Sequence, residues 1–446
     1  MRAINIKRSF ALLVVSLAAT GASFAQTTST SAAAQAALVT EFDVNGLKVL
    51  VKKRTSSPTV AAGLFIRGGS QNITASNAGI EDLMLSTATE GSVKYPRETL
   101  RRLLASTGSG IGSGVNYDYS VVSLATTRDS LDRSWDAFTD IVMHPAFSAE
   151  SVEQTRERLL TNLRNEEDDP DGALQSQVNK TIFAKTGYAN DPNGTIENIT
   201  KLTAADLKAY HQQLMQTSRL LLVVVGDVDP DVIKTRVAAT FGKLPRGSYS
   251  ATNAPTLDFS KGTLDVTTRS LPTNYIEGVF PAPGINDPDF YAMRVAISML
   301  NDRVFEEVRV KRNLSYAPAA GMNAMNGNSA NIYVTAVDAN RTIGIMLDEI
   351  GKLKNNLVDV RDISGVRSQF VTSYFLGQET NAAQAAELGR YELIGGGWRN
   401  AMAFLDKASA VTPADVQRVA QKYMKNIRFV VVGNPSSVDR SIFLRG

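Results

Sequence analysis

Cysteine is absent from this sequence of 446 residues, and histidine occurs only twice. Without cysteine the chain has no thiol nucleophile, no cysteine-ligated zinc and no disulfide bond, so packing must stabilise it. The two histidines, His144 and His211, lie far apart in the chain, and neither has a second metal ligand at helical spacing. We therefore expect both histidines to be structural or surface residues.

Long apolar runs are also scarce. The run at residues 10–19 follows the basic residues Arg2, Lys7 and Arg8 and precedes the small residues Ser23 and Ala25. This order is typical of a secretory signal peptide, and the run is shorter than the roughly 20 residues that a membrane span needs. We predict a signal peptide over residues 1–25, cleaved near Ala25, and a periplasmic location for the rest of the chain.

A strong net charge of either sign is missing as well. The sequence has 47 basic and 44 acidic residues, and three of the basic ones lie in the predicted signal peptide. The exported chain is therefore close to neutral, and the one basic cluster is RVKR at residues 309–312. A nucleic-acid-binding protein normally carries a basic face, so this composition argues against that class.

What the sequence does contain is a duplicated pattern. The stretch LTAADLKAYHQQLMQTSRLLLVVVGDVDP at 202–230 is echoed by VTPADVQRVAQKYMKNIRFVVVGNPSS at 411–437. Each copy has a threonine N-cap, an aspartate in the first helical turn, an amphipathic helix and a buried apolar strand. We predict an α+β protein with two similar domains, residues 38–243 and 263–446, joined by a linker over 244–262 that is rich in Pro, Gly, Ser and Thr.

Turn residues and hydrophobic periodicity predict further elements in the first half. They predict a hairpin over 42–54 with Asn45-Gly46 at its turn, a helix over 79–89, a strand over 112–127 and a helix over 149–167. The stretch GSGIGSGV at 108–115 lacks the ending of a phosphate loop, and we expect a flexible turn into an edge strand. The serine of RNLSYAPAAG lacks the context of a hydrolase nucleophile.

This order of elements, with its Gly-Gly and Glu-Gly-Ser turns and the sequence DDP after the long helix, resembles that of the pitrilysin/insulinase-type zinc peptidases, which include the mitochondrial processing peptidases. The resemblance implies two α/β-sandwich domains that form a half-chamber, which a second chain closes. Members of the family carry the motif H-x-x-E-H on the first helix. Its histidines share one zinc ion, its glutamate is the general base for zinc-bound water, and a glutamate about 76 residues further on is the third ligand.

All four of those positions are changed in this sequence. The motif falls on the segment DLMLS, so Asp82 and Ser86 replace the histidines, Leu85 replaces the base, and the distant glutamate falls on Asn162. Leucine cannot accept a proton, and serine and asparagine are poor zinc ligands. The resemblance therefore implies that this chain alone has no catalytic residue and no cofactor, and that zinc belongs to a partner. We expect the helix to serve packing, with four core residues: Ile80, Leu83, Met84 and Leu85.

A second family feature is retained. The segment 287–321 resembles the family helix that ends with an arginine and has a tyrosine seven residues later, here Arg309 and Tyr316. In the family this pair lies opposite the zinc helix and helps to hold the peptide, and in two-subunit relatives it can come from the subunit without zinc. The glycine-rich segment before that helix is reduced here to MLNDRV. We expect Arg309 and Tyr316 to bind substrate; a solvated charge and a half-buried aromatic residue are the structural alternatives.

These features predict a non-catalytic subunit of a heteromeric periplasmic zinc metallopeptidase. A homologous catalytic subunit with H-x-x-E-H would supply zinc and base, while this chain would close the chamber and bind the peptide, in part through an edge strand near residues 114–123. Two alternatives remain open: a structural subunit, like the core proteins of respiratory complexes, and a stand-alone peptide-binding, chaperone-like protein. No nucleic-acid partner and no membrane span are expected.

Overall fold

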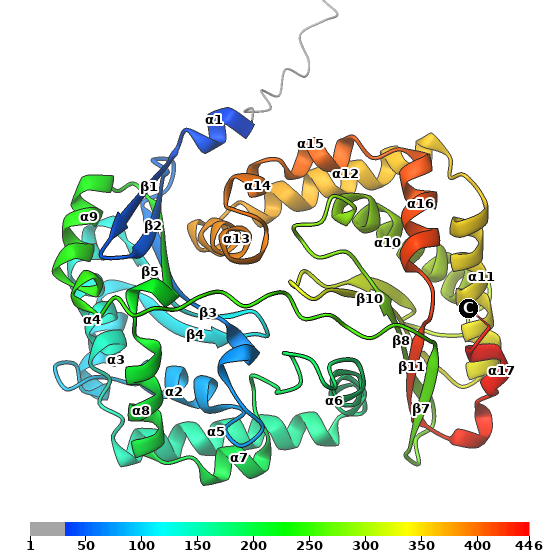
Figure 1. Cartoon of the computed structure of the whole chain (residues 1–446), viewed down its shortest axis with the longest axis horizontal. Coiled ribbons are helices and arrows are strands. Elements are labelled where there is room, and N and C mark those ends of the chain that lie inside the picture. The colour runs from blue at the N-terminus through cyan, green and yellow to red at the C-terminus, as the bar shows by residue number, and fades with distance from the viewer. Residues whose placement is uncertain (1–31, 446) are drawn as a thin grey trace, which may run out of the picture.

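The computed structural model describes residues 32–445 as two β-sheets with helices packed against them (Figure 1). The predicted signal peptide, residues 1–25, lies outside the described residues. A short helix, α1 (Ala32–Ala36), precedes the first strand. Within residues 32–445, no helix is both long and apolar enough to cross a lipid bilayer.

The N-terminal sheet has six strands in the order β1-β2-β6-β3-β5-β4. Its first two strands form the predicted hairpin, in which Asn45 and Gly46 have φ angles of 54° and 86°, as a tight two-residue turn requires. The pairing of β2 with β6 is parallel, and the other pairs are antiparallel. The strands are β1 (Val39–Val44), β2 (Leu47–Lys53), β3 (Thr59–Arg67), β4 (Gly110–Val115), β5 (Tyr119–Thr127) and β6 (Leu220–Gly226).

Most helices of the N-terminal half pack on one face of this sheet. They contribute buried residues to a single core with Leu64 of β3 and Leu222 of β6. These helices are α2 (Ile80–Ala88), α3 (Arg97–Thr107), α4 (Leu131–Met143), α5 (Ala149–Asp168), α7 (Ile196–Lys201), α8 (Ala204–Leu214) and α9 (Pro230–Ala239). The remaining helix, α6 (Pro170–Ile182), packs elsewhere.

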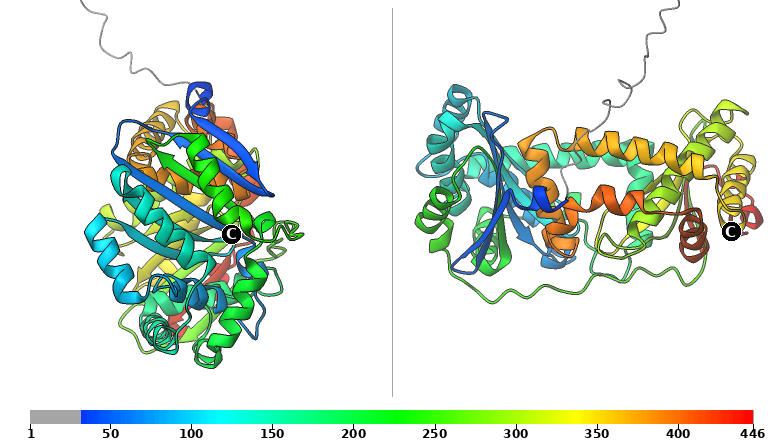
Figure 2. Two further views of the ribbon diagram at one scale, coloured as in Figure 1. Left: turned by 90° about the vertical axis from the view of Figure 1, so that its left-hand side faces the viewer. Right: turned by 90° about the horizontal axis from the view of Figure 1, so that it is seen from above.

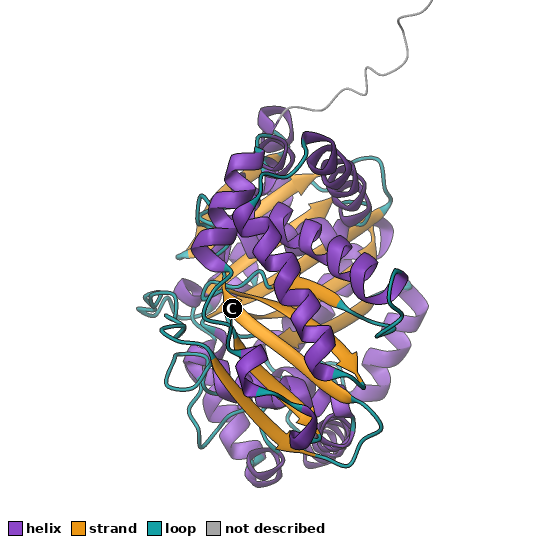
Figure 3. Cartoon of the chain, turned by 90° about the vertical axis from the view of Figure 1, so that its right-hand side faces the viewer, coloured by secondary structure: helices purple, strands orange, loops and turns teal. Residues whose placement is uncertain are grey.

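The C-terminal sheet repeats this plan with five strands in the order β7-β11-β8-β10-β9. Its strands are β7 (Thr263–Thr268), β8 (Asn274–Pro281), β9 (Ala319–Met322), β10 (Ser329–Ala336) and β11 (Arg428–Gly433). Helices lie over this sheet when the molecule is seen from the C-terminal side (Figure 3). The helices that contribute buried residues to the core of this half are α10 (Phe290–Val304), α11 (Ala339–Asn355), α12 (Val360–Gly377), α14 (Arg399–Met402), α15 (Phe404–Ser409), α16 (Pro413–Tyr423) and α17 (Arg440–Phe443). Helix α13 (Asn381–Ile394) contributes Tyr391 and Ile394 to this core and also packs against the N-terminal sheet.

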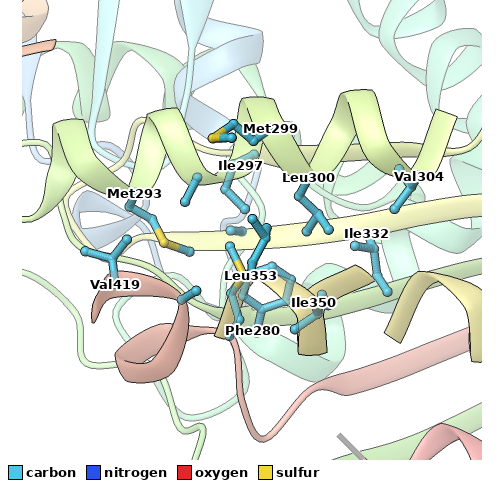
Figure 4. Packing of buried hydrophobic residues seen from close by; sticks show 14 of the residues in the cluster. Phe280, Met293, Ile297, Met299, Leu300, Val304, Ile332, Ile350, Leu353 and Val419 are labelled. Carbon is cyan, nitrogen blue, oxygen red and sulfur yellow. The ribbon is translucent and has the colours of Figure 1, made fainter. Parts of the chain in front are cut away.

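Helix α10 is the central helix of the C-terminal core. Its side chains Met293 and Leu300 lie next to Phe280 of β8 and Leu353 of α11 (Figure 4). All four of these side chains are fully buried. This packing fixes α10, and with it the segment that follows its last turn.

The two halves also share their local signals. Thr203 and Asp206 form a capping box at the start of α8, and Thr412 and Asp415 form the same box at the start of α16. Each helix is followed by a strand, β6 or β11, that pairs parallel with one neighbour and antiparallel with the other. The predicted α+β fold with two similar domains is confirmed.

Each half contributes one helix that packs on the sheet of the other half, and we call these two helices, α6 and α13, the exchanged helices. Helix α6 of the N-terminal half covers β8 and β11 with Leu174 and Val178, and α13 of the C-terminal half covers β3 and β6 with Leu388. Figure 1 shows α13 near the middle of the molecule, beside the N-terminal sheet. Both sheets are therefore buried on two faces, which explains why β6 is apolar throughout.

The predicted single strand over 112–127 is wrong. Residues 116–118 form a turn between β4 and β5, in which the Asn116 side chain accepts hydrogen bonds from the backbone N–H groups of Asp118 and Tyr119. The expected flexible turn over 108–115 is likewise mostly the strand β4, since pairing with β5 outweighs the low strand propensity of glycine. Residues 244–262 contain no helix or strand, and Figure 2 shows them running between the two halves.

Candidate functional site

Helix α2 carries three of the four positions at which the family resemblance places metal-site residues. It begins directly after Gly79, whose φ is 90° and whose added Cβ would lie 2.8 Å from the Cα of Gly194, so no side chain fits there. The helix packs beside β4, α5 and α8. Its predicted packing role is confirmed, because its buried residues include Ile80, Leu83, Met84 and Leu85.

Asp82 and Ser86 lie one helical turn apart on α2 and bind each other. The Ser86 hydroxyl donates a hydrogen bond of 3.0 Å to Asp82 Oδ1. Burial raises the pKa of Asp82, while the hydrogen bond from Ser86 and the positive charge of Arg158 on α5 act in the opposite direction. Of the four changed positions only Asp82 carries a charge, and groups of this chain already engage its carboxylate.

The four changed residues do not fit a zinc ion. Leu85 is only 2% exposed and has no donor atom, and the exposed Asn162 on α5 offers a neutral amide. A structural or catalytic zinc site needs three or four nitrogen, sulfur or charged oxygen ligands. Among residues 32–445, no group of three or more His, Cys, Asp or Glu side chains is placed to hold a metal.

The two histidines lie in different environments. His211 on α8 is buried, and its Nε2 lies 2.7 Å from the carbonyl oxygen of Val142; burial lowers its pKa. His144 is exposed at the end of α4, with its Nδ1 3.2 Å from Asp140 Oδ1. These contacts account for His211 as a structural residue and for His144 as a surface residue.

Glu81, next to Asp82, points away from it into a buried polar cluster. The Tyr210 hydroxyl donates a hydrogen bond of 2.6 Å to Glu81 Oε2, and the Asn72 amide donates one of 3.3 Å to the same atom. Arg219 in turn donates a hydrogen bond of 2.6 Å to Asn72 Oδ1. Burial raises the pKa of Glu81, and these hydrogen bonds and the charge of Arg219 offset that effect only in part. The cluster ties α2 to α8 and to the start of β6.

Arg309 and Tyr316 are brought together at the end of α10. The helix continues into one turn of π-helix, η5 (Phe305–Val310), a form that is frequent at functional sites. The guanidinium carbon of Arg309 lies 4.1 Å from the ring centroid of Tyr316 and 5.0 Å from that of Phe305. Tyr316 is 78% exposed, and no carboxylate within the described residues pairs with Arg309. The pair therefore presents free hydrogen-bond donors at the surface.

Arg309 and Tyr316 follow α10 in the C-terminal half, whereas α2 lies in the N-terminal half; Figure 1 shows these two helices on opposite sides of the molecule. Helix α2 follows β3 in the N-terminal half, as α10 follows β8 in the C-terminal half, so the two helices occupy matching places in the duplicated fold. Among residues 32–445, no hydrogen bond, ion pair or ring contact joins α2 to Arg309 or Tyr316.

An apolar groove lies on the face of the N-terminal sheet that α13 covers. It has a volume of about 570 Å³, and its floor is formed by small residues of β3, β4 and β5. Ala382 and Ala386 of α13 form one wall, and Phe65 lies at its base. Strand β4 is the edge of the sheet and pairs with β5 alone among the described strands. The edge strand is therefore residues 110–115, and the span 114–123 predicted for it includes the turn and half of β5.

Sequence reasoning missed two parts of this region. The positive charge of Arg158 near Asp82 has no motif of its own, since only the packing of α5 on α2 brings the two together. The groove did leave a signal, because Gly110, Gly112 and Gly114 alternate in the sequence as residues on one face of a strand do.

The fold and the site together define a two-domain α+β protein in which the helix at a peptidase metal position carries no metal-binding set. The family model described as Insulinase (Peptidase family M16) matches residues 48–195, and the one described as Peptidase M16 inactive domain matches residues 201–370. The chain belongs to peptidase family M16.

Relatives of this chain match it over most of its length. It is 21% identical over 412 residues to an uncharacterized zinc protease of Mycobacterium tuberculosis, covering 89% of this chain and 93% of that protein. It is 18% identical over 420 residues to mitochondrial-processing peptidase subunit beta of Saccharomyces cerevisiae, covering 88% and 90%. The crystal structure of a peptidase M16 inactive domain from Pseudomonas fluorescens has a TM-score of 0.82 at 19% identity and covers 89% of this chain and 98% of that one.

Proposed function

We propose that this chain is the non-catalytic subunit of a two-chain zinc metallopeptidase in the bacterial periplasm. A homologous subunit with an intact H-x-x-E-H motif supplies the zinc ion and the general base. This chain closes the chamber and contributes Arg309 and Tyr316 to peptide binding. The observation that carries the proposal is the loss of all four metal and base positions on an otherwise well-packed α2.

The retained pair supports a working rather than a purely structural role. The guanidinium of Arg309 lies close to two aromatic rings, those of Phe305 and Tyr316, and Tyr316 is largely exposed. A guanidinium and a phenol can both donate hydrogen bonds to a peptide carbonyl, and to the negative charge that develops on it when water attacks. Neither role requires a metal ion in this chain.

Strand β4 supports the binding of an extended peptide. Its outer backbone N–H and C=O groups have no strand partner among the described residues, and α2 packs directly beside it. An extended peptide can add to such an edge and satisfy these groups by main-chain hydrogen bonds. The added strand would then lie along the chamber wall that this chain forms, facing the zinc site of the partner.

Co-expression with a homologue that carries H-x-x-E-H tests the proposal. We expect the two chains to co-purify, with an interface of more than about 1,000 Å², and the mixture to cleave peptides that neither chain cleaves alone. We also expect elemental analysis to find no stoichiometric zinc in this chain by itself. About one chelator-removable zinc ion per chain, or no association and no gain in cleavage on mixing, would contradict the proposal; independent monomers that bind unfolded peptides would favour the chaperone-like alternative.

A further inference from the structure

The groove under α13 has a property that the proposed function does not require. We infer that it selects extended peptides with aromatic or other large apolar side chains at alternate positions. The inference rests on the proposed function, in which a peptide strand adds to β4, and names the class of side chain that this strand presents. It follows from the shape of the groove floor, from the geometry of strand pairing and from the lack of charge in the lining.

Three glycines of β4 form the floor of the groove beside the free edge of the sheet. Gly110, Gly112 and Gly114 alternate along β4 and therefore point to the same face of the sheet. An added Cβ at Gly110 would meet nothing within 4 Å, and at Gly112 and Gly114 the nearest atoms would be 3.9 Å and 4.0 Å away. None of the three has a φ angle that requires glycine. Turn geometry therefore does not explain them, whereas open space above the strand does.

Pairing geometry determines which residues of an added strand reach this space. Neighbouring strands lie about 4.8 Å apart, and every second side chain of a strand points to the same face. A large side chain on an added strand can lean across the glycine opposite it, as aromatic residues do over edge glycines in sheets. Three alternate glycines thus provide places for large side chains at positions i, i+2 and i+4 of the peptide.

The lining determines the chemistry of those side chains. None of the residues that line the groove in the described structure carries a charge. Phe65, only 2% exposed, places its ring at the base, and Ala382 and Ala386 of α13 form an apolar wall. A carboxylate or an ammonium group would lose water here without gaining an oppositely charged partner in the lining. Large apolar side chains fit this groove, and charged ones do not.

Short blocked peptides test the inference on the purified chain. In each peptide threonine alternates with a variable residue, which is Phe, Ala or Glu, between terminal lysines added for solubility. We expect the Phe peptide to bind at least about tenfold more tightly than the Ala peptide, measured by calorimetry, because each buried ring removes more apolar surface from water. We expect the Glu peptide to bind most weakly.

The variant Gly112→Val fills the floor of the groove. We expect it to lower the affinity for the Phe peptide at least about tenfold, to the level of the Ala peptide, without lowering the melting temperature. Ser113→Val is the matched control, since it adds the same side chain to the same strand on the opposite face and does not line the groove. Equal binding of the Phe and Ala peptides, or unchanged binding by Gly112→Val, would overturn the inference.

A backbone change separates this inference from the proposed function. N-methylation of alternate amides in the Phe peptide removes the donors needed for strand addition but keeps the side chains. If N-methylation weakens binding while Phe and Ala peptides bind alike, the groove is not selective although strand addition holds. If N-methylated and unmodified peptides bind equally, or no peptide binds, strand addition to β4 fails and the selectivity fails with it.

Discussion

The two sheets share one frame but differ in how they fill the face that the exchanged helix covers. Gly63 of β3 and Glu277 of β8 occupy matching positions in the two sheets. Gly63 pairs with Val223, three residues before Gly226 at the end of β6, and Glu277 pairs with Val430, three residues before Gly433 at the end of β11. On the next strand, Gly63 pairs with Ser123, whereas Glu277 pairs with Tyr333. The same place thus holds small, uncharged residues in one half and large polar ones in the other.

The exchanged helices differ in the same sense. Helix α6 and the loop after it bring large side chains to the C-terminal sheet, including Leu174, Ile182 and Tyr188. Helix α13 brings Ala382 and Ala386 to the edge of the groove, which keeps a volume of about 570 Å³. Duplication therefore preserved the backbone plan while side-chain size made one face a packed interface and left the other face partly open.

The largest expected effect concerns the packed face. Leu174 of α6 is 1% exposed and packs with Val279 of β8 and Val430 of β11, so Leu174→Ala leaves a cavity between the two halves. We expect the free energy of unfolding to fall by about 2–5 kcal/mol, as measured by urea denaturation. Because each half lends a helix to the other, circular dichroism and tryptophan fluorescence should report one common transition.

An exposed leucine provides the control for this variant. Leu357 is 64% exposed, and Leu357→Ala should change the free energy of unfolding by less than about 0.5 kcal/mol. Two separate transitions in Leu174→Ala, with the N-terminal sheet unaffected, would show that the halves do not depend on each other's helices.

The next effect concerns Glu277 of β8, the buried carboxyl group that lies where the N-terminal sheet has Gly63. Burial raises the pKa of Glu277 from 4.5 to about 7, and the hydrogen bond of 2.8 Å that Asn331 donates to its Oε1 offsets this only in part. The folded state therefore holds the proton more strongly than the unfolded state. The resulting stability is present below pH 4.5 and is lost as the pH rises through 7, a loss of roughly 3 kcal/mol.

Glu277→Gln isolates this contribution, since the amide stays neutral and its carbonyl can still accept the hydrogen bond from Asn331. We expect the variant to be more stable than the parent at pH 8 and close to it at pH 4.5, as measured by urea denaturation at both values. The same difference in stability at both pH values would mean that Glu277 does not keep its proton in the folded state.

The two helices that follow the matching strands β3 and β8 differ in the chemistry they carry. Helix α2 has lost its chemistry, while the segment after α10 keeps Arg309 and Tyr316. Donors aimed at a developing negative charge contribute a factor of about 100 to 1,000 in other hydrolases. We expect Arg309→Ala or Tyr316→Phe to lower cleavage by the assembled pair at least about tenfold, with assembly and the partner's zinc unchanged.

Arg312 is the matched arginine for this experiment. It is bound to Glu307 in an ion pair at a distance of 2.5 Å, and Arg312→Ala should leave turnover unchanged. Unchanged turnover in both Arg309→Ala and Tyr316→Phe would remove the substrate-binding role and leave the structural one.

Local signals in the sequence predicted much of the fold. The Asn45-Gly46 turn and the threonine caps of α8 and α16 depend on neighbouring residues alone, and each lies where it was predicted. The exchanged helices could not be predicted in this way, because the contact of Phe65 with Gly389 joins segments far apart in the chain. The loss of the metal ligands was visible in the sequence, whereas the groove depends on which elements surround the glycines.

The smallest expected effect concerns the edge strands, where β4 begins with glycine and β9, at the same edge of the other sheet, begins with Ala319 and Ala320. Gly110→Ala makes the two edges more alike, and nothing lies within 4 Å of the added Cβ. We expect the melting temperature to rise, with a gain of about 0.4–1 kcal/mol, because alanine restricts the unfolded chain at a φ that it can adopt. Gly79→Ala should instead destabilise the protein, since Gly79 has a φ of 90° and an added Cβ would lie 2.6 Å from Ile199 Cδ1. A gain at Gly110 would show that glycine in β4 costs stability, so that its role lies in the open groove; a loss would show that β4 needs glycine for its own backbone.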